Sequence, residues 1–233
     1  MEIIFTTASL CRRCRITLIL LPYLEAVMEI LSPDIINTFI EANRKASELG
    51  LVLFSSGNLS LRVDGDRMLI KTSGSRMGAL SSKEVSLCSI GDGKALDGKV
   101  PSKELGFHSG ILRARNDANA VFHFQSTYAT AVACMKETGL NFHVIPEVPH
   151  FIGTPVYVEY HTPGSRELAE AVVEAARAHD MVILRSHGIV TVGAGLDDVI
   201  LKARYFEMAC EILVHVKDPC TISRKDAALL RRS

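Results

Sequence analysis

The chain has 233 residues, of which 48% are hydrophobic, enough for one large domain with a full core. Basic and acidic residues number 26 each, so the formal net charge is +0, which argues against a broad surface for nucleic acid or acidic membrane. The six cysteines are scattered without regular spacing, as expected for reduced thiols, and we therefore predict a cytoplasmic protein whose partner is neither nucleic acid nor a membrane.

The first 31 residues lack regular patterning. Residues 12–21 are basic and then apolar, like a signal peptide, but a proline and a glutamate cut the stretch short and no cleavage site of small residues follows. It is also too short for a membrane span of roughly 20 residues. The C-x-x-C pair at residues 11–14 resembles half a zinc site or a redox pair, but no second pair follows. We expect residues 1–31 to be a loosely attached extension, with Met28 as a candidate natural start that the mass of the natively expressed protein would check.

A helix and three strands are predicted next. The sequence Ser-Pro-Asp at residues 32–34 opens a helix, and its apolar stripe ends before Gly50. Residues 58–63 alternate like a half-buried strand and pair across a turn with residues 68–71. Residues 85–90 form another alternating strand.

Turns rich in hydroxyls and glycine flank this hairpin, at residues 55–57 and 72–75. Such turns expose backbone N–H groups and short hydroxyls that hold phosphate or carboxylate oxygens. Each turn alone is also typical of an ordinary connection. The dinucleotide fingerprint G-x-G-x-x-G does not follow any predicted strand.

Polar side chains then gather in a short helix–strand unit. Glu104 and His108 are four residues apart and share one face of a predicted helix. The apolar residues 118–122 predict a strand that ends just before His123, and a helix is predicted from Ser126. This placement is common for site chemistry, although His123 capping a strand and Glu104 in an ion pair would also explain it.

The rest of the chain alternates strands and helices. The predicted elements are, in order, strands and loops without a helix over 141–160, a helix starting at 163–167, a buried strand over 181–184, a short strand over 189–192 and a helix over about 196–216. The buried strand delivers Ser186, His187 and Gly188 at its end. Residues 224–233 are basic, and we expect them to be mobile.

Hairpins mixed with flanking helices predict one α/β domain whose largely antiparallel central sheet carries helices on both faces. We place this domain at residues 32–218, between the extension at 1–31 and a basic C-terminal tail at 219–233.

Six segments occur in the order found in one family. They are SSGNLSLR (55–62), KTSG (71–74), PSKELGFH (101–108), RNDANAVFHFQS (115–126), TPGSRELAEAV (162–172) and SHGIVTVG (186–193). Read together, they resemble the class II aldolase/adducin family over nearly the whole chain after the extension. The resemblance implies a three-layer α/β/α fold, usually a homotetramer with active sites between subunits, and a small anionic substrate.

The resemblance also implies a metal site. Its ligand positions fall on His123, Gln125 and His187, and the family's general acid/base falls on Glu104. The family's phosphate cradle falls on Asn58, Ser73, Gly74, Ser102 and Lys103. The implied cofactor is a divalent metal, with zinc expected. A metal chelated by the substrate would stabilise the enediolate left by carbon–carbon cleavage, while the carboxylate moves the proton.

Three departures from the family pattern bear on this assignment. Gln125 replaces a histidine, so the site could favour Mn²⁺, bind zinc loosely, recruit another residue or hold no metal. His143 and His150 are candidate replacements, although each also fits a satisfied loop histidine. Lys103 replaces a serine and suits a carboxylate or a differently placed phosphate. The family's tyrosine falls near Val144, which leaves the second acid unassigned.

The predicted function is a metal-dependent, aldolase-type lyase that cleaves a small phosphorylated or carboxylated hydroxy-ketone. The alternatives are a decarboxylase, a dehydratase or an epimerase on the same chemistry, or a non-catalytic, adducin-like assembly protein. Retention of Glu104, His123 and His187 together favours an enzyme, whereas Gln125 argues against one.

Overall fold

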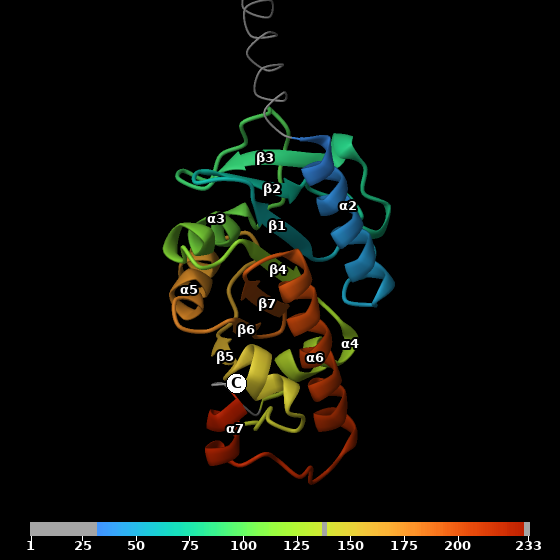
Figure 1. Ribbon diagram of the computed structural model, residues 1–233, viewed down its shortest axis with the longest axis vertical. Helices are drawn as coiled ribbons and strands as arrows, with labels where there is room; N and C mark the ends of the chain where they lie inside the picture. Colours follow the sequence, from blue (N-terminus) through green and yellow to red (C-terminus); the bar gives the residue numbers. More distant parts are fainter. Residues whose placement is uncertain (1–31, 137–138, 231–233) are drawn as a thin grey trace, which may run out of the picture.

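The computed structural model describes residues 32–136 and 139–230, arranged as a layered α/β body (Figure 1). The expectations for residues 1–31 lie outside the described part of the chain. Within the described ranges, no helix is long and apolar enough to cross a membrane.

Seven strands of the described chain form one sheet. They are β1 (Asn58–Arg62), β2 (Arg67–Lys71), β3 (Val85–Ser89), β4 (Ala120–Phe124), β5 (Val156–Val158), β6 (Met181–Leu184) and β7 (Gly188–Gly193). Their order across the sheet is β3-β2-β1-β4-β7-β6-β5. All neighbours are antiparallel except β5 and β6, which confirms the largely antiparallel sheet.

Helices cover both faces of this sheet. They are α2 (Pro33–Glu48), α3 (Leu105–Ala114), α4 (Thr127–Ala133), α5 (Arg166–Ala176), α6 (Leu196–His215) and α7 (Arg224–Leu230), with short turns η1 (Met77–Ala79), η2 (Ser82–Glu84) and η3 (Val148–Ile152). Helices α3 and α5 lie on one face, and α2, α4 and α6 lie on the other (Figure 1). The predicted three-layer α/β/α arrangement is therefore confirmed.

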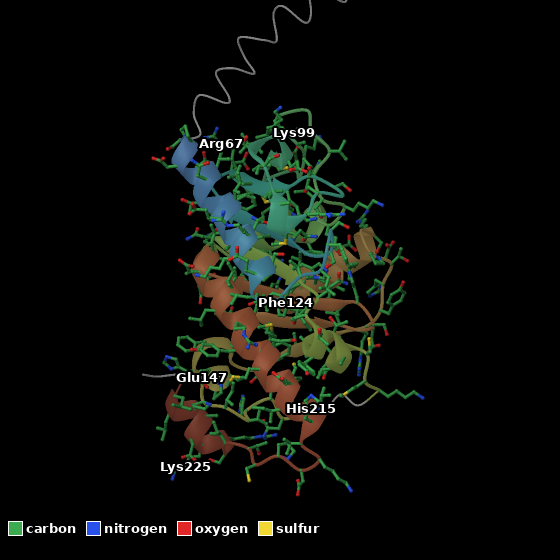
Figure 2. All side chains as sticks on the ribbon, turned by 90° about the vertical axis from the view of Figure 1, so that its right-hand side faces the viewer. Arg67, Lys99, Phe124, Glu147, His215 and Lys225 are labelled. Atoms are coloured by element: carbon green, nitrogen blue, oxygen red, sulfur yellow. The ribbon has the colours of Figure 1, made fainter. Side chains whose placement is uncertain are left out.

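Strand alternation divides the apolar core between the two faces. In β4, Phe122 packs into the cluster with α2, α4 and α6, while the adjacent Val121 packs against α3 and α5. This follows from the period of two, which points successive side chains to opposite sides. Phe124 is fully buried and lies near the middle of the molecule, between Lys99 toward one end and Lys225 toward the other (Figure 2).

Two expectations for the second half of the chain are wrong. The stretch 141–160 contains the helical turn η3 as well as β5, because Pro149 suits the first turn of a helix and Val148 and Ile152 are buried. Most of the segment expected to be mobile instead forms α7, which packs against η3 and buries Ala227, while residues 231–233 lie outside the described part of the chain. Ser223 caps its start by accepting the backbone N–H of Asp226 and donating to that residue's carboxylate.

The sheet brings the polar residues of distant segments to one place. Asn58 at the start of β1 lies opposite His123 of β4, and β4 pairs in turn with β7. The β6–β7 turn carries His187, and Glu104 directly precedes α3.

Candidate active site and metal centre

His123 occupies the penultimate position of β4, inside the strand rather than after it as the sequence predicted. Its side chain is buried, and its Nδ1 lies 3.0 Å from the backbone oxygen of Ile189. A carbonyl oxygen only accepts, so Nδ1 carries the proton and donates it. In the neutral tautomer with the proton on Nδ1, the lone pair lies on Nε2, the arrangement typical of a histidine that binds a metal.

His187 lies in the tight turn between β6 and β7. Ser186 before it has φ +52°, and a Cβ at Gly188 after it would lie 2.8 Å from Gln125 Cγ and 3.0 Å from His123 Cε1. Only glycine fits this approach without a shift of its neighbours. The side-chain amide of Gln125 donates to the His187 carbonyl at 2.8 Å, so Gln125 ties this turn to the end of β4.

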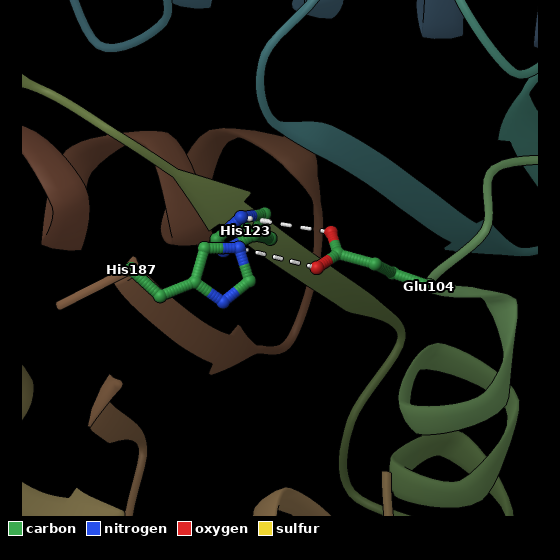
Figure 3. Close-up of side chains that lie close together, drawn as sticks. All are labelled: Glu104, His123 and His187. Carbon is green, nitrogen blue, oxygen red and sulfur yellow. Dashed lines mark ion pairs between the residues drawn. The ribbon is translucent and has the colours of Figure 1, made fainter. Parts of the chain in front are cut away.

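Glu104 directs its carboxylate at both imidazoles (Figure 3). Its Oε2 lies 3.5 Å from His123 Nε2, and its Oε1 lies 3.4 Å from His187 Nε2. The two rings are 4.8 Å apart between centroids. Asn58 Nδ2 donates to Glu104 Oε2 at 2.8 Å. Glu104 shares a helical turn with His108, as predicted, but it occupies the N-cap position of α3 rather than lying within the helix, and its side chain makes no capping hydrogen bond.

The charge states of these groups suit metal binding. Burial, and then the proximity of His123, lower the pKa of His187 to about 4, so this imidazole is neutral at pH 7. Burial alone would raise the pKa of Glu104. The nearby histidines and the hydrogen bond from Asn58 outweigh that effect and lower its pKa, so the carboxylate stays ionised.

The three side chains fit a divalent cation. Glu104, His123 and His187 each offer one ligand atom, and these three atoms lie within 4.8 Å of one another. No other group of three or more histidine, cysteine, aspartate or glutamate residues in the described part of the chain has this property. Glu104 Oε1 and His187 Nδ1 are buried and make no hydrogen bond to described residues. A buried carboxylate oxygen is costly to leave without a partner, and two imidazoles with one carboxylate form a donor set that zinc accepts.

A chain of hydrogen bonds continues behind Glu104. Asn58 Oδ1 lies 2.5 Å from His108 Nε2, and Ser60 Oγ lies 2.7 Å from His108 Nδ1. His108 and Ser60 are fully buried. Burial lowers the pKa of His108 to about 3, so its ring is neutral. Its two ring nitrogens face Asn58 and Ser60.

A cavity of about 220 Å³ opens beside the three candidate ligands. All five residues predicted for the phosphate cradle line this cavity: Asn58, Ser73, Gly74, Ser102 and Lys103. Gln125 lines it as well. The structure thus brings every predicted site residue to one cavity. Asn58 donates one amide N–H to the carboxylate of Glu104, whereas Ser102 Oγ accepts the backbone N–H of Glu104 and so fixes its backbone.

Sequence reasoning missed Lys71, which also lines the cavity. Its ammonium group donates to the backbone oxygens of Ser55 and Ser75, joining the two turns on either side of the hairpin. Burial lowers the pKa of Lys71, although Glu104 and Glu84 oppose that shift. The available signal was its position at the end of an apolar strand, directly before the turn at residues 72–75.

Neither candidate replacement for the missing histidine reaches the site. His143 lines a separate cavity of about 550 Å³ beside α7, and His150 Nδ1 donates to the Leu230 carbonyl. Within the described residues, the candidate ligand group therefore contains two imidazoles, those of His123 and His187, and no third one.

Comparison with known proteins places the chain in a family. The family model described as the class II aldolase and adducin N-terminal domain matches residues 37–214. The chain belongs to the class II aldolase and adducin family. The resemblance seen in the six sequence segments is thereby confirmed.

Curated relatives in this family carry two different activity names. The chain is 32% identical to the 3-oxo-tetronate 4-phosphate decarboxylase of Haemophilus influenzae over 162 residues, which cover 68% of this chain and 77% of the relative. It is 35% identical to the L-fuculose phosphate aldolase of Methanocaldococcus jannaschii over 170 residues, covering 72% and 90%.

Solved structures agree on the class II aldolase fold. YgbL of Escherichia coli matches with a TM-score of 0.78 at 25% identity, covering 85% of this chain and 98% of that one. An L-fuculose 1-phosphate aldolase matches with a TM-score of 0.77 at 24% identity, covering 87% and 96%, and supports the fold alone.

Proposed function

We propose that the protein is a metal-dependent lyase that breaks a carbon–carbon bond next to a carbonyl in a small phosphorylated or carboxylated hydroxy-ketone, with zinc as the expected metal and Mn²⁺ as the alternative. The observation that carries this proposal is the convergence of Glu104, His123 and His187 at the edge of a polar cavity. We take the assembly to be the homotetramer that the resemblance implies. Sedimentation of the purified chain measures this oligomeric state.

Different residues around the cavity would bind the metal and the anionic end of the substrate. A bound divalent cation would be held by His123 and His187, with Glu104 beside them, and would supply Lewis-acid stabilisation of the negative charge that develops next to the carbonyl. Lys71 and Lys103 present positive charge to the anionic end of the substrate, and Ser73 and Gly74 offer a short hydroxyl and an open backbone turn. Anchoring that end orients the reacting bond.

Glu104 is the group able to move a proton. Its carboxylate is ionised and has one oxygen, Oε1, that receives no hydrogen bond from described residues. Buried beside the cavity, it accepts a proton from a substrate hydroxyl as an aldol bond breaks, or returns one to the carbon that is left.

Decarboxylation is the second candidate. Two lysines line a cavity of about 220 Å³, which suits a substrate with both a phosphate and a carboxylate, and relatives named 3-oxo-tetronate 4-phosphate decarboxylase support it. An adducin-like assembly role would not require three converging ligands and an aligned hydrogen-bond chain behind them.

Parallel assays separate the two lyase activities. The metal-loaded protein is given L-fuculose 1-phosphate, with aldehyde release as the readout, and 3-oxo-tetronate 4-phosphate, with CO2 release as the readout. Turnover of either compound supports the proposal and chooses the reaction. Absence of turnover with both, together with failure to bind metal, would favour the assembly role.

Replacing Glu104 tests the mechanism. We expect Glu104→Gln to keep the metal but to lower kcat by about 10²- to 10⁴-fold, because the amide cannot accept a proton. Glu207→Gln is the matched control, since Glu207 is an equally buried carboxylate (both 8% exposed) that accepts the Ser126 hydroxyl and two backbone N–H groups at the start of α4, away from the cavity. An unchanged rate in Glu104→Gln would remove this residue from the mechanism.

A further inference from the structure

Behind the proposed base lies a directed chain of four side chains, Ser60, His108, Asn58 and Glu104, that ends at one oxygen of the carboxylate. We propose that Ser60 and His108 are positioning residues, which fix the amide of Asn58 so that it donates to Glu104 Oε2 and leaves Oε1 as the reactive oxygen. This inference rests on the proposed function. Neither Ser60 nor His108 lines the cavity beside the site.

The direction of each hydrogen bond follows from the chemistry of its partners. The carboxylate of Glu104 only accepts, so Asn58 must turn its NH2 group toward Oε2, 2.8 Å away. The amide oxygen then faces His108 and only accepts, so Nε2 carries the proton. In the neutral ring Nδ1 is then an acceptor, and Ser60 donates its hydroxyl to it at 2.7 Å. The other acceptor near Ser60 Oγ, the Val121 carbonyl, is 3.5 Å away.

The orientation of this amide has a consequence for the site. If Asn58 flipped, its oxygen would face the carboxylate of Glu104, and two acceptors would repel each other without a proton between them. The His108 Nε2–H group prevents the flip because it requires the oxygen on its own side. The second N–H of Asn58 stays available to the cavity that Asn58 lines.

The geometry is held rigidly by two elements. Asn58 and Ser60 are two apart on β1 and therefore project to the same face of the sheet, which α3 covers with His108. The ring of His108 stacks on that of Phe107 at 4.8 Å between centroids, and both side chains are buried. The amide that holds the carboxylate is thus positioned by a strand and a helix rather than by a loop.

The test combines spectroscopy of the metal-free protein with kinetics. Nitrogen NMR of 15N-histidine-labelled protein at pH 7 should show His108 neutral, with its proton on Nε2. Ser60→Ala should shift the side-chain amide resonances of Asn58 and change the balance of His108 tautomers. The matched control is Ser109→Ala, which removes another buried hydroxyl one residue from His108, but one that bonds only to backbone oxygens of its own helix.

With whichever of the two phosphorylated compounds the wild type turns over, Ser60→Ala should lower kcat about tenfold or more while KM stays within about twofold. Ser109→Ala should change neither constant. A proton on Nδ1 in the wild type, or Asn58 resonances that move no more in Ser60→Ala than in Ser109→Ala, would overturn the proposal. Because the NMR measurement needs neither metal nor substrate, its outcome is independent of whether the proposed lyase activity is found.

Discussion

Gln125 lies at a position where the resemblance implies a histidine ligand. The resemblance assigns it a ligand position, and the structure places it next to the site, with its amide nitrogen on the His187 carbonyl. A glutamine can coordinate only through its oxygen, which is a weaker donor for zinc than imidazole. The observed hydrogen bond gives Gln125 a structural task, because it holds the turn that carries a candidate ligand.

Replacing Gln125 by histidine should therefore change metal affinity. We expect Gln125→His to bind zinc about tenfold tighter or more, since a third imidazole would join the two already present. Competition with a chromophoric chelator measures the affinity. Gln125→Ala, which removes the link to His187 without adding a ligand, is the control and should bind zinc no tighter than the wild type. If Gln125→His binds no tighter either, this side chain does not point at the ion.

The β6–β7 turn is the element on which the site depends most. It places His187 between the left-handed Ser186 and the crowded Gly188, and Gln125 fastens it to β4. Any displacement of this turn moves one candidate ligand relative to the other, because His123 lies in the neighbouring strand.

We predict that Gly188→Ala lowers the free energy of unfolding by about 1–3 kcal/mol and weakens metal binding. The new methyl would lie 2.8 Å from both Gln125 Cγ and the Phe124 carbonyl oxygen, so β4 and the turn must separate. Chemical denaturation and a zinc titration measure the two effects. Gly65→Ala is the control, because a Cβ there meets no atom within 4 Å. Equal stability and equal metal affinity in the two variants would contradict this view of the turn.

Local patterning was sufficient to predict most elements. The helix over α2, the β1–β2 hairpin, the buried β6 and the long α6 follow from apolar periods of 3.6 and 2 and from recognisable caps. Helix α7 was missed because its basic composition concealed the Ser223 cap and the apolar contact of Ala227. The helical turn η3 is stabilised by tertiary burial, which a single sequence does not reveal.

The site was predictable only in pieces. The four-residue spacing of Glu104 and His108 placed them on one helical turn, and the alternation of β1 placed Asn58 and Ser60 on one face. That these two pairs meet depends on how α3 packs on the sheet, and neither spacing contains that information. Lys71 was missed for the same reason, because its part in the cavity depends on the turns that its ammonium group joins.

Across the molecule, two apolar clusters hold the sheet from both sides and leave the ends of its central strands to carry chemistry. The strands β1, β4 and β7 lie in the middle of the sheet order, so the residues at their ends are fixed by neighbours on both sides. Asn58 and His123 derive their positions from this arrangement, and His187 adjoins it. The architecture thus supplies a rigid frame for the candidate metal site.

The most direct test of the account is the metal content of the protein, measured by plasma mass spectrometry after purification without chelator and loading with zinc or manganese. We expect about one ion per chain in the wild type, and loss of most of it in both His123→Ala and His187→Ala. His143→Ala should retain the wild-type content, because His143 lies at a different cavity. A wild type that holds no ion after loading, or variants at positions 123 and 187 that hold as much as the wild type, would contradict the account.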